Sequence, residues 1–448
     1  MTNNKNQSPF YSQLVQQLLP ALTVSFVAIS LGAAFGVLSG RGALAGILSA
    51  GVIALITAAF GGTRIQCSGP TAPMTAVTIL LVSAVGGGLL ADHPDVDPDR
   101  FINLVLLLTG AMLIVASLLR LGRFIKLIPK IVISGFMNGI ALLIWVGEFR
   151  SIFGIGGKTA YLGNVFVNLA IVLLTLSVIF TLPLLLRKVS DRLNSFFPAT
   201  LIAIVVVSTL SNLFGLDVQH VSLGGSIESL TDIKGMIVGQ LPTEWSLALL
   251  ILAAPFVVQL AMLAYLDTLL TSLVVDRKVE IMHGRQDPTK PNQELCAQGI
   301  ANAAVSVFGG IPGAQATIRS VLILNEGATM RLAGVLVGIF VLIEMLMFQD
   351  LISLIPQAVF SGVLLKVGYD VFDWMPVRQY ISQLLQPSPA QLPPIGHSGM
   401  ALIAGTALLT VLVNLSVAVI VFTIIFYLAR KFGGIKDIKT ESAMHDEG

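Results

Sequence analysis

Uninterrupted apolar stretches, each about 18 to 25 residues long, recur along the whole sequence, and one helix of that length crosses a hydrocarbon core about 30 Å thick. In lipid only helices and closed barrels satisfy their backbone hydrogen bonds, and this sequence lacks the short alternating strands of a barrel. Charged residues make up 11% of the chain, against about 25% in a soluble domain. The sequence therefore predicts an all-α polytopic membrane protein.

Hydropathy alone supports about ten to twelve spans, because two of the stretches, 295–308 and 314–325, are short. The count reaches fourteen only with the repeat described below. The expected spans are 17–39, 43–60, 71–91, 101–121, 129–147, 165–187, 198–214, 246–273, 295–308, 314–325, 329–348, 353–369, 397–413 and 415–430.

Charged loops orient these spans. The loop 92–100 is acidic, whereas the loops around 120–130 and 187–192 are basic. Basic loops lie on the cytoplasmic side of a membrane, so both chain termini are expected there, in the cell inner (plasma) membrane. The expected organisation is a cytoplasmic segment 1–16, an extracytoplasmic connector 215–244 and a cytoplasmic tail 431–448.

The two halves of the chain resemble each other. Residues 125–135 and 352–362 share Ile, Leu, Ile, Pro, Val, Ser and Gly at the same offsets. Phe-Gly-Gly followed by a Gly/Pro-rich stretch also occurs twice, from Phe60 and from Phe308. Two repeated motifs in the same order indicate a duplicated unit. Because each unit would have seven spans, an odd number, the two units would enter the membrane with opposite polarity. We therefore expect fourteen segments in a 7+7 inverted repeat, with 17–214 as the first repeat and 245–430 as the second.

The Gly/Pro stretches 61–73 and 309–317 occupy corresponding places in the two halves. Gly and Pro interrupt a continuous helix, so each stretch predicts an extended segment followed by a half-helix. Two half-helix N-termini that face one pocket offer free backbone N–H groups and partial positive charge, which suits an anion. The alternative is ordinary loop glycine before a full helix.

One carboxylate, Asp267, lies inside an apolar span, where an ionisable side chain is costly and indicates function. Thr271, four residues later, shares its helix face. A carboxylate and a hydroxyl one turn apart suit Na⁺, a hard cation that takes oxygen ligands, and they also suit a proton site. The residues leave this choice open.

Other single residues have competing interpretations. Arg319, one turn into the second half-helix, can grip an oxyanion with two N–H groups, or it can simply neutralise Asp267. Lys366 is expected to pair with Asp370 or to extend toward the interface. Phe35 is a candidate for lining the cavity, although a packing role is the commoner one.

The chain resembles the SulP (sulfate permease) family of inorganic anion transporters over about residues 15–432. Within that family, the segments around Asp267 and Lys366 are most similar to cyanobacterial sodium-dependent bicarbonate transporters. The segments that carry the resemblance are 68–74, 132–136, 266–272, 308–314, 366–370 and 373–374.

The resemblance implies a core domain of segments 1–4 and 8–11 that moves against a gate domain of segments 5–7 and 12–14. It implies anion binding between segments 1, 3, 8 and 10, and a Na⁺ site formed by Asp267, Thr271 and Thr317. The candidate substrate-binding residues are then Phe35, Thr71, Ala72, Ala316, Thr317 and Arg319, and the candidate cation-binding residues are Asp267, Thr271, Gln315 and Thr317.

The sequence departs from the family pattern at three places. Gln315 stands where the bicarbonate branch has a small Gly, and Arg319 matches a basic position typical of the sulfate and chloride branches. About 18 residues follow the last expected span, so we expect no STAS domain.

The expected function is secondary active transport of sulfate or bicarbonate, coupled to Na⁺ or H⁺, by alternating access. Its expected partners are the anion and the lipid bilayer, with no cofactor beyond the coupling ion and no nucleic acid; a homodimer stays open. The alternatives are a nucleobase permease of the same fold and an anion channel or exchanger. No enzyme motif lies in a span, so an enzyme is not expected.

Overall fold

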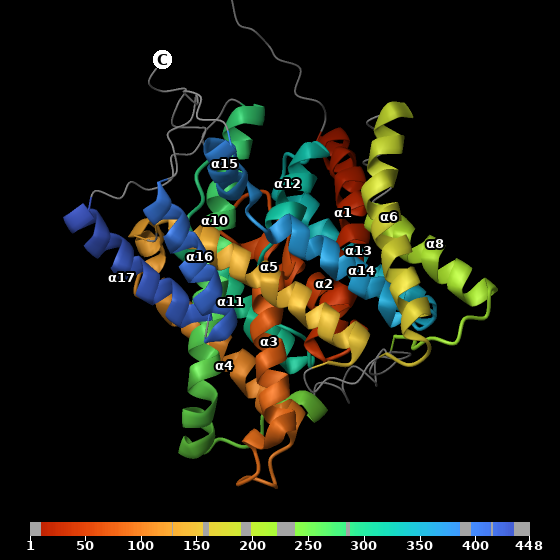
Figure 1. The fold of residues 1–448 in the computed structure, drawn as a ribbon, viewed down its shortest axis with the longest axis horizontal. Coiled ribbons are helices and arrows are strands. Elements are labelled where there is room, and N and C mark those ends of the chain that lie inside the picture. Colours follow the sequence, from red (N-terminus) through yellow and green to blue (C-terminus); the bar gives the residue numbers. More distant parts are fainter. Residues whose placement is uncertain are drawn as a thin grey trace, which may run out of the picture. The chain divides into compact units, whose positions relative to one another are not determined.

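The computed structural model is mainly helical, and Figure 1 shows the helices from the N-terminus to the C-terminus. Among the described residues, two three-residue strands form a single small sheet. The described residues are 10–127, 129–155, 161–189, 199–221, 238–283, 287–385, 396–413 and 415–433.

The described part of the first half contains seven α-helices. They and the intervening elements are α1 (Phe10–Ser39), α2 (Ala43–Phe60), β1 (Ser68–Pro70), α3 (Ala72–Ala84), a π-helical segment (Val85–Leu89), α4 (Pro98–Leu118), a 3-10 helix (Leu121–Leu127), α5 (Lys130–Phe153), α6 (Val165–Val189) and α8 (Ala199–Leu213).

The second half begins with the longest helix of the described chain. Its elements are α10 (Leu247–His283), α11 (Pro291–Val307), β2 (Gly313–Gln315), α12 (Thr317–Asn325), α13 (Arg331–Ile352), α14 (Gln357–Val371), α15 (Trp374–Leu385), α16 (His397–Leu412) and α17 (Leu415–Gly433).

Each of the fourteen expected spans coincides with a helix, but the bounds differ in places. The helix α10 continues to His283, ten residues past the expected end at 273, and α15 was not expected, because its 12 residues are amphipathic. Seven of the described helices are long and apolar enough to cross a membrane. Residues 1–9, most of 215–244 and residues 434–448 lie outside the described chain, as does Asn414.

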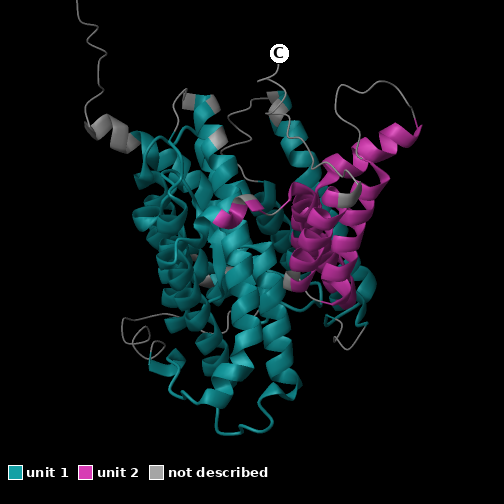
Figure 2. Cartoon of the chain, turned by 90° about the vertical axis from the view of Figure 1, so that its left-hand side faces the viewer, with its two compact units in different colours: residues 1–123, 151–363 teal, residues 124–150, 364–448 magenta. Residues whose placement is uncertain are grey.

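The chain divides into two compact units, coloured separately in Figure 2. Unit 1 contains residues 1–123 and 151–363, and unit 2 contains residues 124–150 and 364–448. All the segments expected in the core domain belong to unit 1. The helices α6 and α8, which the resemblance assigns to the gate domain, also cluster with unit 1.

Close helix contacts in unit 1 depend on glycine. A Cβ on Gly46 of α2 would collide with the backbone oxygen of Gly32 on α1. Likewise, a Cβ on Gly299 of α11 would lie 2.7 Å from the backbone oxygen of Gly110 on α4. Small residues allow two helix backbones to approach in lipid, where packing rather than hydrophobic burial drives helix association. These two pairs join α1 to α2 and α4 to α11, and both α2 and α11 also contact the strands.

Unit 2 packs by the same principle and by aromatic stacking. Gly135 of α5 abuts Ile403 of α16, and Trp145 stacks on Phe372 with ring centroids 5.7 Å apart. Lys366 Nζ lies 2.6 Å from Asp370 Oδ1, which confirms the expected pair one turn apart on α14.

Candidate functional site

Two extended segments, one from each half of the chain, pair at the candidate site. Strand β1 runs antiparallel to β2, with Ser68 opposite Gln315 and Pro70 opposite Gly313. Every residue of both strands is buried. The structure therefore confirms that the stretches 61–73 and 309–317 are not continuous helix.

A helix begins directly after each strand. Thr71 precedes α3 and Ala316 precedes α12, and neither residue caps its helix with a side-chain hydrogen bond within the described chain. Because the strands are antiparallel, the two helices leave the small sheet in opposite directions. With no side-chain cap, the N–H groups of Ala72 and Met74 in α3 and of the first turn of α12 can meet an oxygen ligand at the positive end of the helix dipole, whereas Pro73 has no N–H to offer.

Arg319 on α12 reaches across to the other half of the chain. Its side chain is 1% exposed, and Nη2 donates to the carbonyl oxygen of Pro70 over 2.9 Å. Nε and Nη1 are buried and have no hydrogen-bond partner among the residues that the structure describes. Gly69 allows this approach, because a Cβ there would lie 2.7 Å from Nη1. A buried guanidinium whose Nε and Nη1 groups have no partner is well suited to an oxyanion.

Asp267 lies on α10, close enough to Arg319 and to Thr71 to interact with both. No ion pair of 4.0 Å or less joins Asp267 to Arg319 among the described residues, although the two charges lie near enough to attract each other. Asp267 Oδ2 is buried, and neither it nor Thr71 Oγ1 makes a hydrogen bond of regular geometry with the described chain. The carboxylate thus keeps a free acceptor inside the protein.

Two threonine hydroxyls pair with each other near Asp267: Thr271 lies one turn further along α10, and Thr317 begins α12. Thr271 Oγ1 and Thr317 Oγ1 are 2.6 Å apart, and the Gln315 backbone N–H donates to Thr268 Oγ1 over 3.3 Å. These contacts join α10 to β2 and to the start of α12. A carboxylate oxygen without a partner and a pair of hydroxyls fit the oxygen ligands that a hard cation requires.

The Gln315 amide is oriented differently from a cation ligand. Its Oε1 accepts a hydrogen bond from Thr63 Oγ1 at 3.4 Å, and its Nε2 is buried without a partner in the described chain. In this orientation the amide offers a donor, which suits an anion better than a cation.

The other candidate substrate-binding residues lie at the starts of α3 and α12 and on α1. Thr71 and Ala72 are buried at the start of α3, Ala316 is half-buried and Thr317 is exposed. Phe35 is 4% exposed on α1, a helix that packs against α3, α12 and β1. Phe35 thus lies on an element next to both broken helices.

A buried carboxylate that our sequence reasoning missed, Glu294 of α11, holds the segment before β1. It is fully buried, and its Oε2 accepts hydrogen bonds from the Thr63 backbone N–H and from Gln66 Nε2, each at 2.9 Å. Its Oε1 accepts from Gln298 Nε2 at 3.2 Å. This carboxylate fixes the chain that leads into the first half-helix.

The same face of α11 holds both strands. Gln298 Nε2 donates to Ser68 Oγ over 2.7 Å in β1, and Asn302 exchanges two hydrogen bonds of 2.9 Å with the backbone of Gly313 in β2. Glu294, Gln298 and Asn302 are spaced four residues apart, which places them on one helix face. That spacing was the sequence signal for a polar support inside an apolar helix.

The comparison with known protein families is consistent with this geometry. The sulfate permease family matches residues 14–384, and the chain belongs to this family.

Curated relatives include two bicarbonate transporters named BicA. The one from Picosynechococcus sp. is 30% identical over 413 residues, which cover 89% of this chain and 67% of the relative. The one from Synechocystis sp. is 31% identical over 384 residues, covering 81% and 62%. A putative sulfate transporter of Bacillus subtilis, YvdB, is 26% identical and covers 93% and 74%. The chain thus spans about two thirds of the length of the two bicarbonate transporters.

Solved structures share the fold. The transmembrane domain of a cyanobacterial BicA superposes with a TM-score of 0.74 at 29% identity, covering 91% of this chain and 98% of that domain. SLC26A9 superposes with a TM-score of 0.69 at 16% identity, covering 95% and 66%. The family and these relatives are multi-pass membrane transporters rather than enzymes. They favour transport of an inorganic anion over the nucleobase alternative.

Proposed function

We propose that this chain is a secondary active transporter that carries a small inorganic oxyanion, sulfate or bicarbonate, together with Na⁺ or H⁺. One observation carries the proposal: the Nε and Nη1 groups of the buried Arg319 have no hydrogen-bond partner within the described chain and lie beside the paired strands β1 and β2.

The anion would bind where the two broken helices begin. A helix N-terminus contributes about 0.3 to 1 kcal/mol to anion binding at an exposed site and up to about 2 kcal/mol at a partly buried one. A hydrogen bond to a charged group contributes about 1.5 to 3 kcal/mol. Arg319 is therefore the main anion ligand in this proposal, with Thr71, Ala72, Ala316 and the Gln315 amide around it. Phe35 would line the pocket from α1.

The coupling cation would bind on the α10 side of the same pocket. Asp267 Oδ2 supplies the charge, and the hydroxyls of Thr271 and Thr317 supply neutral oxygens. A bound Na⁺ or proton offsets the negative charge of Asp267, which would otherwise repel the anion. This dependence links the two substrates, because each binds more tightly when the other is present.

The wider architecture of the proposal is fourteen segments in a 7+7 inverted repeat with core and gate domains. Each half supplies one strand and one broken helix at corresponding places, which supports the repeat. The helices α5 and α14 also begin at Lys130 and Gln357, which are equivalent positions of the echoed segments. The charge distribution supports placement in the inner membrane with both termini in the cytoplasm. Movement of the loaded site past the gate gives alternating access.

Uptake by proteoliposomes tests the proposal. Purified protein is reconstituted, and uptake of labelled sulfate and of labelled bicarbonate is measured with Na⁺ and pH gradients imposed separately. We expect one anion to accumulate against its gradient when one of the two cation gradients is present. Uptake that ignores both gradients contradicts coupled transport, and currents much faster than carrier turnover indicate a channel instead.

A further inference from the structure

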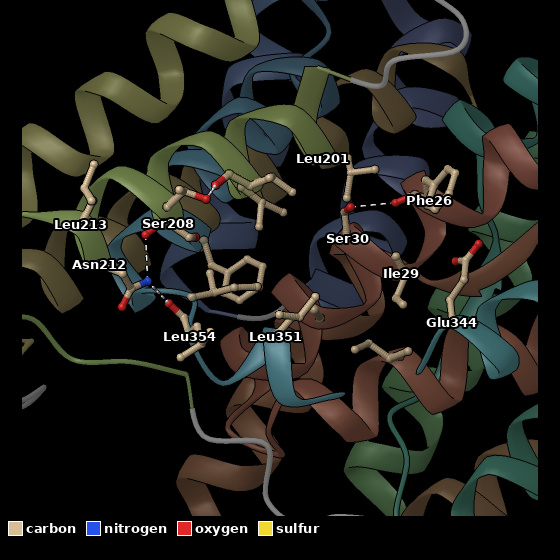
Figure 3. A pocket seen from close by; sticks show the side chains of 17 residues that line it. Phe26, Ile29, Ser30, Leu201, Ser208, Asn212, Leu213, Glu344, Leu351 and Leu354 are labelled. Carbon is tan, nitrogen blue, oxygen red and sulfur yellow. Dashed lines mark hydrogen bonds between the residues drawn. The ribbon is translucent and has the colours of Figure 1, made fainter. Parts of the chain in front are cut away.

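An apolar cavity is lined by residues other than those of the candidate site. Residues of α1, α2, α8, α13 and α14 line a partly open cavity of about 700 Å³ within unit 1 (Figure 3). Most of the lining side chains are aliphatic or aromatic. None of the residues that line it belongs to the candidate anion or cation set. The volume lies in the range of sites that hold drug-sized ligands, about 300 to 1,000 Å³.

One carboxylate, Glu344 of α13, lines this cavity. Glu344 is 6% exposed, and its Oε1 accepts a hydrogen bond of 2.6 Å from Ser25 Oγ. Its Oε2 is buried and has no hydrogen-bond partner in the part of the chain that the structure describes. No Lys, Arg or His is among the described residues that line the cavity. The described lining therefore provides an acceptor and no cationic side chain to balance it.

The opposite end of the cavity is weakly polar. Figure 3 shows Ser208 and Asn212 at one end and Glu344 at the other, with Ile29 and Leu351 between them. The Ser208 hydroxyl is buried without a partner among the described residues, whereas Asn212 Nδ2 already donates to the carbonyl oxygens of Ser208 and Leu354. The cavity is thus elongated and apolar, with one strong acceptor at its end.

The chemistry of a complementary ligand follows from this arrangement. A carboxylate buried with a single hydrogen bond is costly unless a cation or a further donor pairs with it. An ammonium group satisfies Oε2 by charge and by hydrogen bonding together. An anionic ligand would be repelled by Glu344, and an uncharged alcohol could donate a hydrogen bond to Oε2 but would leave its charge unbalanced. We propose that this cavity binds a lipophilic ammonium ion, whose charged head contacts Glu344 and whose apolar chain extends toward Ser208.

Three probes test the proposal; they share a twelve-carbon alkyl tail and differ in their polar head group. The melting temperature of the purified full chain in detergent is measured with increasing dodecylamine, dodecanol or dodecanoate. A ligand that binds only the folded protein raises this temperature. We expect a saturable rise with dodecylamine and little or no rise with the other two. An equal rise with dodecanol would mean that binding does not require the ammonium charge, and would overturn the proposal. A larger rise with dodecanoate would overturn it as well.

Two substitutions locate the effect. Glu344→Gln keeps the shape of the side chain and removes its charge, and we expect the apparent affinity for dodecylamine to fall at least about tenfold. Ala33→Phe fills the cavity from α1 and should abolish the rise. Glu244→Gln, an exposed position, serves as the charge-matched control and should leave the affinity unchanged. Unchanged dodecylamine affinity in Glu344→Gln contradicts the assigned contact. The comparison of the three probes on the unmodified chain decides the question even if a variant does not fold.

Discussion

The guanidinium group of Arg319 occupies the space that a side chain on Gly69 would need, since a Cβ at residue 69 would lie 2.7 Å from Nη1 and 2.9 Å from Nη2. The two residues come from different halves of the chain. Gly69, from the first half, leaves the space in which the guanidinium lies, and Arg319, from the second half, supplies the positive charge. This contact makes the role of Arg319 testable without changing Arg319 itself.

The substitution Gly69→Ala should displace the Arg319 guanidinium from the Pro70 carbonyl and raise the KM for the anion several-fold. The control is Gly87→Ala, because a Cβ at Gly87 meets nothing within 4 Å. The KM is measured by initial uptake rates in proteoliposomes. A normal KM in Gly69→Ala, with protein amounts equal to the control, would show that the position of Arg319 does not matter for the anion.

Direct removal of the charge should have a larger effect. Arg319→Ala removes the unpartnered Nε and Nη1 donors together with the charge, and we expect the anion affinity to fall by about tenfold or more. Arg319→Lys should restore part of this affinity but not all of it, because an ammonium group lacks the planar fork of a guanidinium. Affinities are measured by competition of unlabelled anion in the uptake assay. If Arg319→Ala transports the same anion with undiminished affinity, the residue is structural.

Asp267 should determine the dependence on the coupling ion. Asp267→Asn keeps the size of the side chain and removes its charge, so cation-dependent uptake should be lost while expression stays intact. Asp287→Asn is a suitable control, because Asp287 makes an ion pair of 3.3 Å with Arg64 in which both side chains are partly exposed. Such surface pairs contribute about 0 to 1 kcal/mol. Uptake by Asp267→Asn that still responds to Na⁺ or pH would remove Asp267 from the cation site.

The threonine pair provides a test of the Na⁺ ligands. Thr271→Val and Thr317→Val each remove one hydroxyl of a pair 2.6 Å apart, so each should raise the Na⁺ concentration needed for half-maximal uptake. The loss of Na⁺ binding free energy in the double variant should be smaller than the sum of the losses in the two single variants, because the two hydroxyls are in contact and their effects are not additive. The Na⁺ dependence of uptake gives these values. Strict additivity, or no change in any variant, contradicts a shared Na⁺ site.

Glu294 should contribute to stability rather than to chemistry. Glu294→Gln places an amide donor among the N–H groups of Thr63, Gln66 and Gln298, so at least one donor loses its acceptor. We expect a loss of about 1 to 3 kcal/mol in the free energy of unfolding. Thermal melting of the detergent-solubilised protein measures this loss, with the exposed Glu244→Gln as control. Equal melting temperatures for the two variants would contradict the structural role.

Much of the fold followed from local patterns in the sequence. The expected span 43–60 coincides with α2, and the interruptions before α3 and α12 followed from Gly and Pro, which act locally on the backbone. The helix α15 was missed because its apolar residues are spread around polar ones, so no long apolar stretch marks it. A hydropathy profile detects apolar stretches long enough to cross a membrane, and it does not detect an amphipathic helix of 12 residues.

The candidate site was less predictable than the fold. Asp267 and Arg319 stand out because a charge inside an apolar span is rare. The contact of Arg319 with the Pro70 carbonyl could not be predicted, since it joins residues 249 positions apart. The Glu294 support had a visible spacing of four, but its partners Thr63 and Gln66 also come from a distant segment. Glu344 was missed although it is a charge in an apolar helix, and the same reasoning that found Asp267 would have found it.

The central claim is that one pocket holds an anion on Arg319 and a cation on Asp267, so that each strengthens the binding of the other. Calorimetric titration of the purified chain with the transported anion tests this claim most directly, at low and high Na⁺ and at two pH values. The account predicts that the anion binds more tightly when the coupling cation is abundant. It also predicts that Asp267→Asn removes this cation effect while Arg319→Ala weakens binding under every condition. Anion affinity that is the same in all conditions and in both variants would contradict the account.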